Sequence, residues 1–236
     1  MGFGNRTLFE IILISLGIYQ RNFLPFIGVY LMPTLIYLGF FAFFGTLDPF
    51  VFMPEALSGE SISRFLLLSA FTLMAGLFNL MVTAGIIGMA EQAYLKKFTS
   101  MERCFAVMLR KWAPLLGASI LLMIFVVAGF MLFIIPGVVL LIIFLYTFHV
   151  VVIDNAGSIG GLKGSYRFLR NGNVLNTCLL VAFVFIITLL IEMFSYIPDA
   201  GNVIAISLST ISTPYFIILF TVAYIEGKEN TQEIDF

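Results

Sequence analysis

Six long apolar runs occupy most of this 236-residue chain, and they restrict its fold more than any other feature. A helix needs about 20 apolar residues to cross roughly 30 Å of hydrocarbon, and each run approaches that length. Hydrophobic residues make up 61% of the chain and charged residues 11%, whereas soluble domains are about a quarter charged. The sequence therefore predicts an all-α integral membrane protein with six transmembrane helices. We place them at Phe23–Leu47, Phe65–Ala90, Trp112–Ile135, Pro136–Ile153, Val174–Ile197 and Val203–Ile225.

The positive charges predict how the chain is oriented. Every Lys and Arg except Arg64 lies in the N-terminal segment, in the connections 91–111 and 154–173, or in the tail. A six-span chain brings all of these segments to one side, and an excess of Lys and Arg marks the cytoplasmic side. We therefore expect a protein of the cell membrane with both termini in the cytoplasm. Residues 1–227 would form a single polytopic membrane domain, and the acidic residues 228–236 a disordered cytoplasmic tail.

A shorter amphipathic segment precedes each outward span. The clearest is Thr99–Lys111, whose apolar residues recur at helical spacing and whose Thr99 and Glu102 fit a capping box. We predict a short helix on the cytoplasmic face at each of these places. Surface helix, span out, loop and span back then occur three times in the same orientation, which is a parallel repeat. The surface helices are Arg6–Tyr19, Thr99–Lys111 and Ser158–Arg170, and the copies cover approximately residues 6–90, 99–153 and 158–225.

One octapeptide pattern occurs at the same joint of two copies, as "RNFLPFIG" at Arg21–Gly28 and as "RKWAPLLG" at Arg110–Gly117. We interpret it as a corner between the membrane surface and the membrane interior. The aromatic residue fits the interface, the proline falls in the first turn of the span, and the glycine permits close helix approach. Two unrelated boundaries that happen to match are the alternative. The predicted corner residues are Phe23, Pro25, Gly28, Trp112, Pro114 and Gly117; the third copy, "RNGNVLNT", keeps only the arginine and has Gly172 as its breaker.

Basic residues next to the spans are expected to contact anionic lipid headgroups, each adding about 1 kcal/mol of attraction. Lys163, Arg167 and Arg170 form the clearest stripe, at positions i, i+4 and i+7. Membrane lipids are therefore the predicted partners, and the sequence is also compatible with a protein partner or a homo-oligomer. A net charge of −1 gives no case for nucleic-acid binding. The predicted headgroup contacts are Arg21, Arg110, Lys111, Lys163, Arg167 and Arg170.

Polar residues inside the spans are costly in lipid, so they are the best candidates for function. The structural alternative is open for each: an interfacial position for His149 and Glu192, and contacts between helices for Asn79 and Thr83. The hydroxyl run before Pro214 fits either a kinked packing helix or a hydrophilic pathway. The candidate intramembrane polar residues are Asn79, Thr83, His149, Asp154, Glu192, Thr210, Ser212 and Thr213.

The chain offers little for catalysis or metal binding. Cys104 and Cys178 lie far apart and form no CxxC motif, and His149 is the single histidine. His149 and Asp154 have no third ligand nearby in the sequence. We therefore predict no enzyme, no catalytic residue, no metal and no cofactor.

A resemblance appears at "FIIPGVVLLIIF" (Phe133–Phe144), followed by "VVIDNAGSIGGLKGSYRFLRNGNV" (Val151–Val174). A Pro-Gly entry into a span, a short polar exit and a "GL..S.R..R" helix resemble the YciC-like inner-membrane proteins. They are also similar to the membrane domain that precedes the catalytic domain in some bacterial glycerophosphoryl diester phosphodiesterases. Tyr196–Gly227 resembles the last span of that family. The resemblance implies a polytopic membrane protein without the catalytic domain, and it implies no settled activity for the membrane part.

Three functions follow as hypotheses: a non-enzymatic module that organises the bilayer or supports a partner, a small transporter or channel for a lipid or amphipathic solute, and, least favoured, a membrane-embedded enzyme. The position of the polar residues separates the first two. Convergence on one water-accessible cavity favours transport, whereas dispersal into helix contacts favours the organising module.

Overall fold

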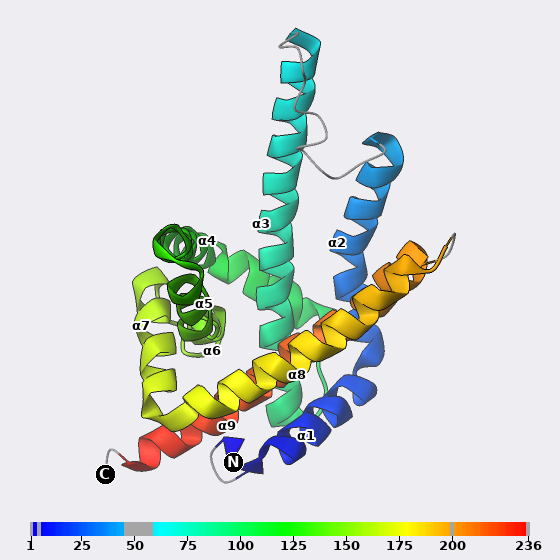
Figure 1. Ribbon diagram of the computed structural model, residues 1–236. Coiled ribbons are helices and arrows are strands. Elements are labelled where there is room, and N and C mark those ends of the chain that lie inside the picture. Colours follow the sequence, from blue (N-terminus) through cyan, green and yellow to red (C-terminus); the bar gives the residue numbers. More distant parts are fainter. Residues whose placement is uncertain (1, 4–5, 45–58, 199–200, 235–236) are drawn as a thin grey trace.

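The computed structural model describes residues 2–3, 6–44, 59–198 and 201–234, and it is helical almost throughout (Figure 1). Five helices in these ranges are long and apolar enough to cross a membrane, or six if the bent pair α1–α2 counts as one span. The structure thus agrees with an all-α membrane protein. The helices are α1 (Leu8–Arg21), α2 (Phe23–Phe44), α3 (Gly59–Lys96), α4 (Met101–Leu132), α5 (Ile134–Ile143), α6 (Thr147–Ile153), α7 (Ser158–Phe168), α8 (Val174–Met193) and α9 (Gly201–Ile234), with a π-helical turn η2 (Leu169–Asn173) and a 3₁₀ turn η3 (Phe194–Tyr196).

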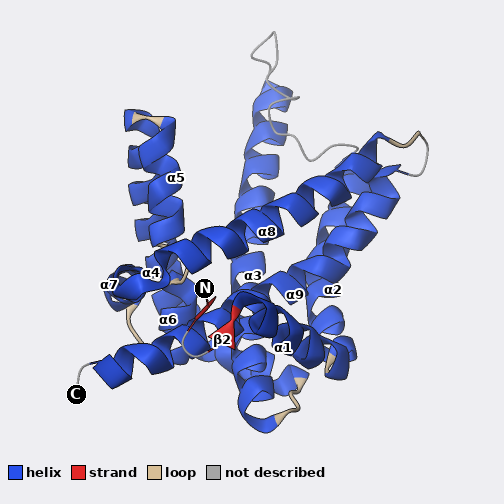
Figure 2. Ribbon diagram, turned by 60° about the horizontal axis from the view of Figure 1, so that its bottom comes forward, coloured by secondary structure: helices blue, strands red, loops and turns tan. Residues whose placement is uncertain are grey.

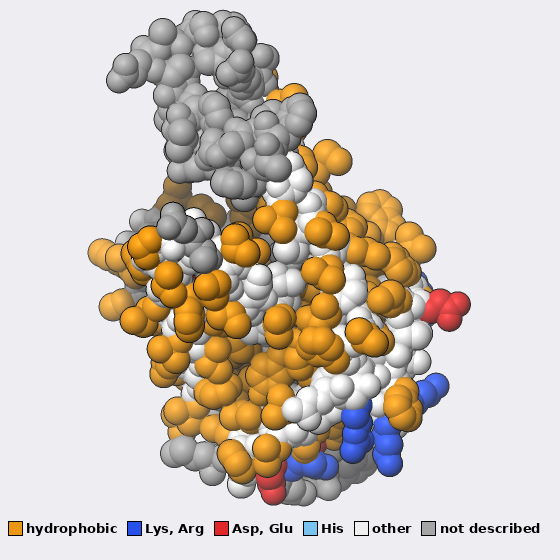
Figure 3. Space-filling model, turned by 90° about the vertical axis from the view of Figure 1, so that its right-hand side faces the viewer, with side chains coloured by type: hydrophobic (Ala, Val, Ile, Leu, Met, Phe, Trp, Pro, Cys, Tyr) orange, Lys and Arg blue, Asp and Glu red, His pale blue; other side chains and the backbone are white. Residues whose placement is uncertain are grey.

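Three hairpins diverge from a common base (Figures 1 and 2). They are α2–α3, α4 with α5–α6, and α8–α9. We define the base as α1, the first turns of α4, α7, and the C-terminal ends of α3, α6 and α9; both termini lie there (Figure 1). Figure 3 shows a face covered by apolar side chains, with charged side chains gathered at its lower edge. This distribution suits a protein that is surrounded by lipid above a polar base.

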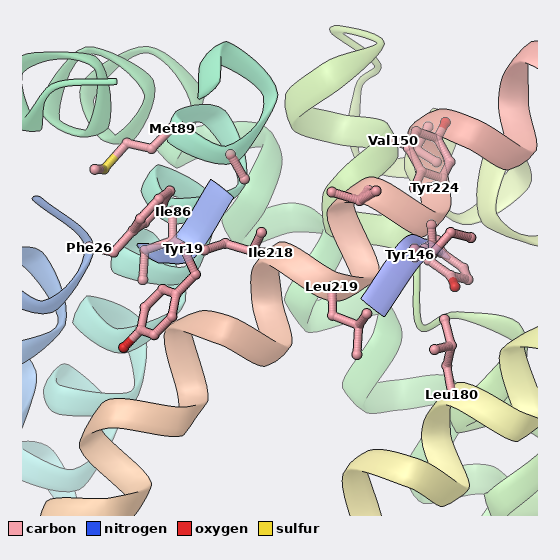
Figure 4. Close-up of a cluster of buried hydrophobic side chains, with 14 of the residues drawn as sticks. Tyr19, Phe26, Ile86, Met89, Tyr146, Val150, Leu180, Ile218, Leu219 and Tyr224 are labelled. Carbon is pink, nitrogen blue, oxygen red and sulfur yellow. The ribbon is translucent and has the colours of Figure 1, made fainter. Parts of the chain in front are cut away.

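The core lies in the base rather than along the whole hairpins. Buried residues concentrate in the last part of α3, in α6 and in the second half of α9. Figure 4 shows them in two groups along α9, with Ile218 beside Tyr19 and Phe26, and Leu219 beside Tyr146. Only 17–33% of the most apolar window of each candidate span is buried. Most of the surface of each span therefore faces its surroundings, which for apolar side chains means lipid.

The N-terminus is fastened to the base by a short hairpin. β1 (Gly2–Phe3) and β2 (Arg6–Thr7) pair antiparallel, with Gly2 opposite Thr7. Phe3 is fully buried and stacks on Phe168 of α7, with the ring centroids 6.2 Å apart. The sequence pattern did not predict this strand pair.

The observed helices refine the predicted spans. The third and fourth predicted spans separate at Phe133, which is extended, so that Pro136 falls in the first turn of α5 rather than at the turn between the helices. The fourth span is also broken between α5 and α6. There the Ser165 hydroxyl donates to the Ile143 carbonyl (2.6 Å) and accepts from the Tyr146 amide (3.2 Å), which satisfies the backbone groups that the break releases.

The predicted boundaries differ at other places too. α3 extends beyond Phe65–Ala90 at both ends, and the end of the first predicted span, at Leu47, lies outside the described residues. α9 continues to Ile234, through most of the segment 228–236 that the sequence predicts as a disordered tail. Between residues 228 and 234 there is neither proline nor glycine to end the helix.

The predicted corner exists at the first joint and is wrong at the second. α1 and α2 meet at an angle of 84° around Asn22. In contrast, α4 runs from Met101 to Leu132 as one helix with Pro114 inside it, so that the predicted surface helix Thr99–Lys111 and its span are continuous. A proline removes one backbone hydrogen bond but does not by itself turn a helix.

The third joint has a corner although it lacks the octapeptide. Asn171 and Gly172 leave helical geometry between α7 and α8, and Gly172 has a φ of +92°, which glycine adopts without a steric penalty. The buried Asn173 donates through Nδ2 to the Phe168 carbonyl (3.0 Å). Gly172 is thus the breaker that the sequence predicted.

Candidate functional site

A hollow lies between α2 and the α8–α9 hairpin. Its volume is about 540 Å³, and it is half open. Tyr30, Thr34 and Tyr37 line one side from α2, and Glu192 and Thr210 line the other. Apolar residues complete the wall, including Leu38, Val203 and Ile206. A mixed wall of hydroxyl, phenol and alkyl groups suits an amphipathic molecule better than an ion or a sugar.

Two of the predicted polar residues, Glu192 and Thr210, therefore reach one cavity. Glu192 lies near the end of α8 and Thr210 lies in α9. Ser195 and Asn202, which lie between them in the sequence, also line the hollow. Thr210 is buried and donates its hydroxyl to the Ile206 carbonyl (2.7 Å), whereas Glu192 is exposed. The exposed Glu192 carboxylate is thus accessible to a ligand at this site.

His149 does not reach this cavity. It is 6% exposed and lies in the base between Tyr146 and Tyr224, whose ring centroids are 5.5 and 6.1 Å from its own. Neither ring nitrogen makes a hydrogen bond of ordinary geometry within the described residues. His149 therefore packs as an aromatic ring in the core of the base.

Asp154 belongs to a polar network at the base instead of pairing with His149. Its carboxylate accepts from the Tyr224 hydroxyl (2.5 Å) and pairs with Lys228 (2.6 Å). A second group of contacts links the N-terminus, α3 and α9. Arg6 pairs with Glu226 (2.9 Å), and Glu226 accepts from the Tyr94 hydroxyl (2.6 Å). These contacts tie the ends of α3, α6 and α9 together, which is a structural role.

The remaining polar candidates bond within their own helices. The Thr83 hydroxyl donates to the Asn79 carbonyl (2.9 Å), while Asn79 Oδ1 is buried and has no hydrogen-bond partner in the described part of the chain. Ser212 and Thr213 both donate to the Ser209 carbonyl, at 3.4 and 2.7 Å. The carbonyl that Pro214 frees is that of Thr210, so these hydroxyls do not compensate for it. The predicted polar residues thus scatter, apart from Glu192 and Thr210.

A second hollow lies between α5, α7 and α8 and combines apolar walls with a basic edge. It is a half-open groove of about 360 Å³ with Val139, Ile143, Val174 and Cys178 in its walls. Tyr166 and Arg170 of this groove also line a smaller neighbouring hollow of about 250 Å³, together with Lys163 and Arg167. The predicted basic stripe therefore forms the mouth of an apolar groove.

The other predicted headgroup residues are not at this groove. Arg21 is exposed at the end of α1. Arg110 donates to the Asn155 side chain (2.9 Å), and Lys111 is only 8% exposed on α4. Lys111 therefore does not extend freely toward headgroups as the sequence predicts, because α4 continues past it as a helix and packs against α6 and α7.

Several residues at these hollows were missed by the sequence patterns. Tyr30, Thr34 and Tyr37 recur at i, i+4 and i+7, which places three polar groups on one face of an apolar helix. That spacing is a readable signal for the large cavity.

In the described part of the chain, no three His, Cys, Asp or Glu side chains lie close enough together to hold a metal ion, and both cysteines are free. Comparison with known proteins finds no matching family model, no matching curated protein and no matching solved structure.

Proposed function

We propose that this chain is a non-enzymatic polytopic membrane protein that organises the lipids between its hairpins. The observation that carries this proposal is the groove between α5, α7 and α8, whose apolar walls end at Lys163, Arg167 and Arg170. Apolar walls fit acyl chains, and a basic mouth fits an anionic headgroup. The occupant is an anionic phospholipid of the leaflet at the base.

The three cations at the mouth have no competing partner. Among the described residues, no carboxylate pairs with Lys163, Arg167 or Arg170, whereas Arg6, Arg103 and Lys228 of the same base are all in ion pairs. All three are exposed, and Lys163 and Arg167 stand one turn apart on α7. Their charge is available to lipid phosphates.

The cell membrane, with both termini cytoplasmic, is the location that this proposal entails, because the basic mouth then faces the anionic leaflet.

Three parallel repeats are part of the same proposal. α1 packs on α9, the first turns of α4 pack on α3, and α7 packs on α6. Each surface helix thus rests on the returning span of the preceding copy, in a closed cycle. The family resemblance to YciC-like proteins is compatible with this arrangement and stays a prediction.

Lipid retention tests the proposal. The full chain is purified in an uncharged detergent, incubated with equal amounts of phosphatidylglycerol and phosphatidylcholine, and analysed by native mass spectrometry. We expect retained phosphatidylglycerol to exceed phosphatidylcholine at least fivefold. The variant Lys163→Gln/Arg167→Gln/Arg170→Gln removes this preference, whereas the matched control Lys96→Gln/Lys97→Gln, which removes two exposed and unpaired lysines of the base, keeps it. Equal retention of both lipids by the natural chain overturns the proposal.

A transporter of lipids or amphipathic solutes is the second candidate, and the large cavity favours it, because Glu192 and the tyrosines of α2 are polar groups placed at an opening toward lipid. The packed core of the base opposes it, since Tyr146, Ile218 and Leu219 are fully buried there. A dithionite assay on liposomes with fluorescent phospholipids separates the two functions. The organising role predicts no exchange between leaflets above protein-free liposomes. If the natural chain exchanges lipids between the leaflets, and Ala205→Phe abolishes this exchange by filling the cavity, transport is established instead.

A further inference from the structure

A small hollow between α4 and α6 is surrounded by three positive charges. Its volume is about 70 Å³, and Arg103, Arg110 and Lys111 line it together with Ala106, Val107 and Val152. Arg110 and Lys111 follow Arg103 on α4 by seven and eight positions, about two helical turns, so all three side chains lie toward one side of the helix. The hollow is separate from the lipid groove, with which it shares no lining residue.

Among the described residues, positive charge exceeds negative charge in this cluster. Glu91 is the carboxylate that reaches it, through Arg103 Nη2 at 3.2 Å, and Arg110 bonds the neutral amide of Asn155. Arg103 Nε is buried and has no hydrogen-bond partner among the described residues. Lys111 is 8% exposed and makes no hydrogen bond or ion pair with the described residues. Neighbouring cations that outnumber the carboxylate beside them repel one another, and an anion bound in the hollow would relieve this repulsion.

The size and the donors define the anion. A hollow of about 70 Å³ is too small for an acyl chain or a nucleoside, and it fits one tetrahedral group. Two guanidinium groups and one ammonium match a phosphoryl group, whose oxygens accept several charge-assisted hydrogen bonds at once. We propose that Arg103, Arg110 and Lys111 form a binding pocket for a phosphoryl group, which is supplied either by inorganic phosphate or by a phosphomonoester lipid headgroup.

The pocket would couple α3, α4 and α6. Glu91 belongs to α3, the three cations to α4 and Val152 to α6. A bound phosphoryl group would therefore neutralise repulsion at the place where these helices meet. Its occupancy is expected to appear as a gain in thermal stability.

Thermal unfolding of the full chain tests this in two arms. In the first, the chain in uncharged detergent is compared in sodium phosphate and in sodium chloride of equal ionic strength. In the second, the chain in phosphatidylcholine nanodiscs is compared with and without phosphatidic acid, with phosphatidylglycerol as the anionic phosphodiester control. We expect a rise in Tm in at least one arm; a rise with phosphate identifies a soluble ligand, and a rise confined to phosphatidic acid identifies a lipid headgroup.

Lys111→Met distinguishes a built pocket from general charge attraction. We expect this variant to unfold at a higher temperature than the natural chain without ligand, since it removes one of three mutually repelling positive charges, and to lose the ligand-dependent rise. The control Lys97→Met removes an exposed lysine and keeps the rise. Where Lys111→Met does not fold, Arg110→Gln is tested instead. We expect the ligand concentration that gives half of the rise in Tm to be at least tenfold higher for this variant than for the natural chain. No rise in either arm, or a rise that these variants leave unchanged, overturns the pocket. The Lys163→Gln/Arg167→Gln/Arg170→Gln variant should keep the rise, so failure of the lipid groove and failure of this pocket are separable.

Discussion

The first and second joints share an octapeptide pattern and have different backbones. The chain turns by 84° between α1 and α2, whereas the matching residues of the second joint lie inside the continuous helix α4. Both joints have the proline at the fifth position of the pattern. The proline therefore permits a corner without producing one.

The second position of the pattern accounts for the difference. Asn22 occupies it at the first joint, and its Nδ2 donates to the carbonyls of Ile18 (3.1 Å) and Lys97 (3.2 Å). Its Oδ1 accepts from the Thr99 amide (3.0 Å). An amide both donates and accepts, so Asn22 satisfies the backbone groups of α1 and of the α3–α4 loop. Lys111 at the second joint cannot accept a hydrogen bond, and the helix continues through it.

The glycine at the end of the pattern has the same role at both joints. A Cβ atom on Gly28 would collide with Met101, the first residue of α4, and a Cβ atom on Gly117 would collide with Ser158, the first residue of α7. In each case the glycine admits the first residue of another helix, α4 or α7. The shared pattern thus marks a packing contact, and the corner is an additional feature of the first joint alone.

Replacement of Asn22 should have the largest effect. Asn22→Ala leaves the Lys97 carbonyl and the Thr99 amide without their partner, and such losses cost about 1–3 kcal/mol each when buried. We expect the free energy of unfolding in detergent to fall by about 2–4 kcal/mol. Asn171→Ala, at the exposed part of the third joint, is the control and should change it by less than about 0.5 kcal/mol. Equal effects of both substitutions would contradict the role of Asn22.

Substitution of the shared glycines should rank next. Gly117→Ala places a methyl group against Ser158, whose Cβ would be 3.1 Å away and whose Oγ donates to the Pro114 carbonyl (2.9 Å). We expect a loss of about 1–3 kcal/mol in unfolding free energy. Gly28→Ala should cost less than about 1 kcal/mol, because it meets the flexible end of Met101.

The double variant Gly117→Ala/Ser158→Gly checks the cause of that loss. Ser158→Gly removes the atoms that the new methyl group would meet, so the double variant should recover part of the stability lost in Gly117→Ala alone. Additive losses in a double-mutant cycle would show that the two residues do not contact each other as described.

Replacement of the two prolines should then change the free energy of unfolding by different amounts. Pro114 lies inside α4, so Pro114→Ala supplies an N–H that can bond the Arg110 carbonyl. We expect unfolding free energy to rise by about 1 kcal/mol, the net value of one hydrogen bond. Pro25→Ala lies in the first turn of α2, where no such bond is missing, and should change stability by a few tenths of a kcal/mol, roughly. A larger loss for Pro114→Ala than for Pro25→Ala would mean that the packing of α4 on α7 depends on a proline-induced bend.

Local pattern and apolar length predicted the helical class, the helix α1 and the approximate positions of the apolar helices, because these depend on neighbours in sequence. The corner at Trp112 and Pro114 was wrong, because whether a helix turns depends on a hydrogen-bond partner such as Lys97, which comes from another segment. The candidate site was predicted in part. Glu192 and Thr210 meet at one cavity, whereas the core position of His149 depends on α9, which follows it by more than fifty residues.

The first turns of α1 and α4 differ in how they are capped. The capping box predicted at Thr99 and Glu102 is not formed: Ser100 is the N-cap of α4 without a side-chain hydrogen bond, and the Thr99 hydroxyl bonds Gln92 (3.0 Å). A complete box occurs at Thr7 and Glu10 of α1, where "TLFE" has the same spacing. The Thr7 amide donates to Glu10 Oε2 (2.7 Å), and the Glu10 amide donates to Thr7 Oγ1 (3.3 Å).

The box at Thr7 and Glu10 predicts the smallest effect, a dependence on acidic pH. Hydrogen bonds from the backbone and hydroxyl of Thr7 lower the pKa of Glu10 from its ordinary value of 4.5. A lowered pKa in the folded state means that the box stabilises α1 above pH 4.5 and loses this contribution as the pH falls through the folded-state pKa. Glu10→Gln should therefore make Tm less dependent on pH in the acidic range, while Glu102→Gln, at the start of α4, should leave the dependence as it is. If Glu102→Gln flattens the acidic limb as strongly as Glu10→Gln, the two helix starts are capped alike and the contrast between them fails.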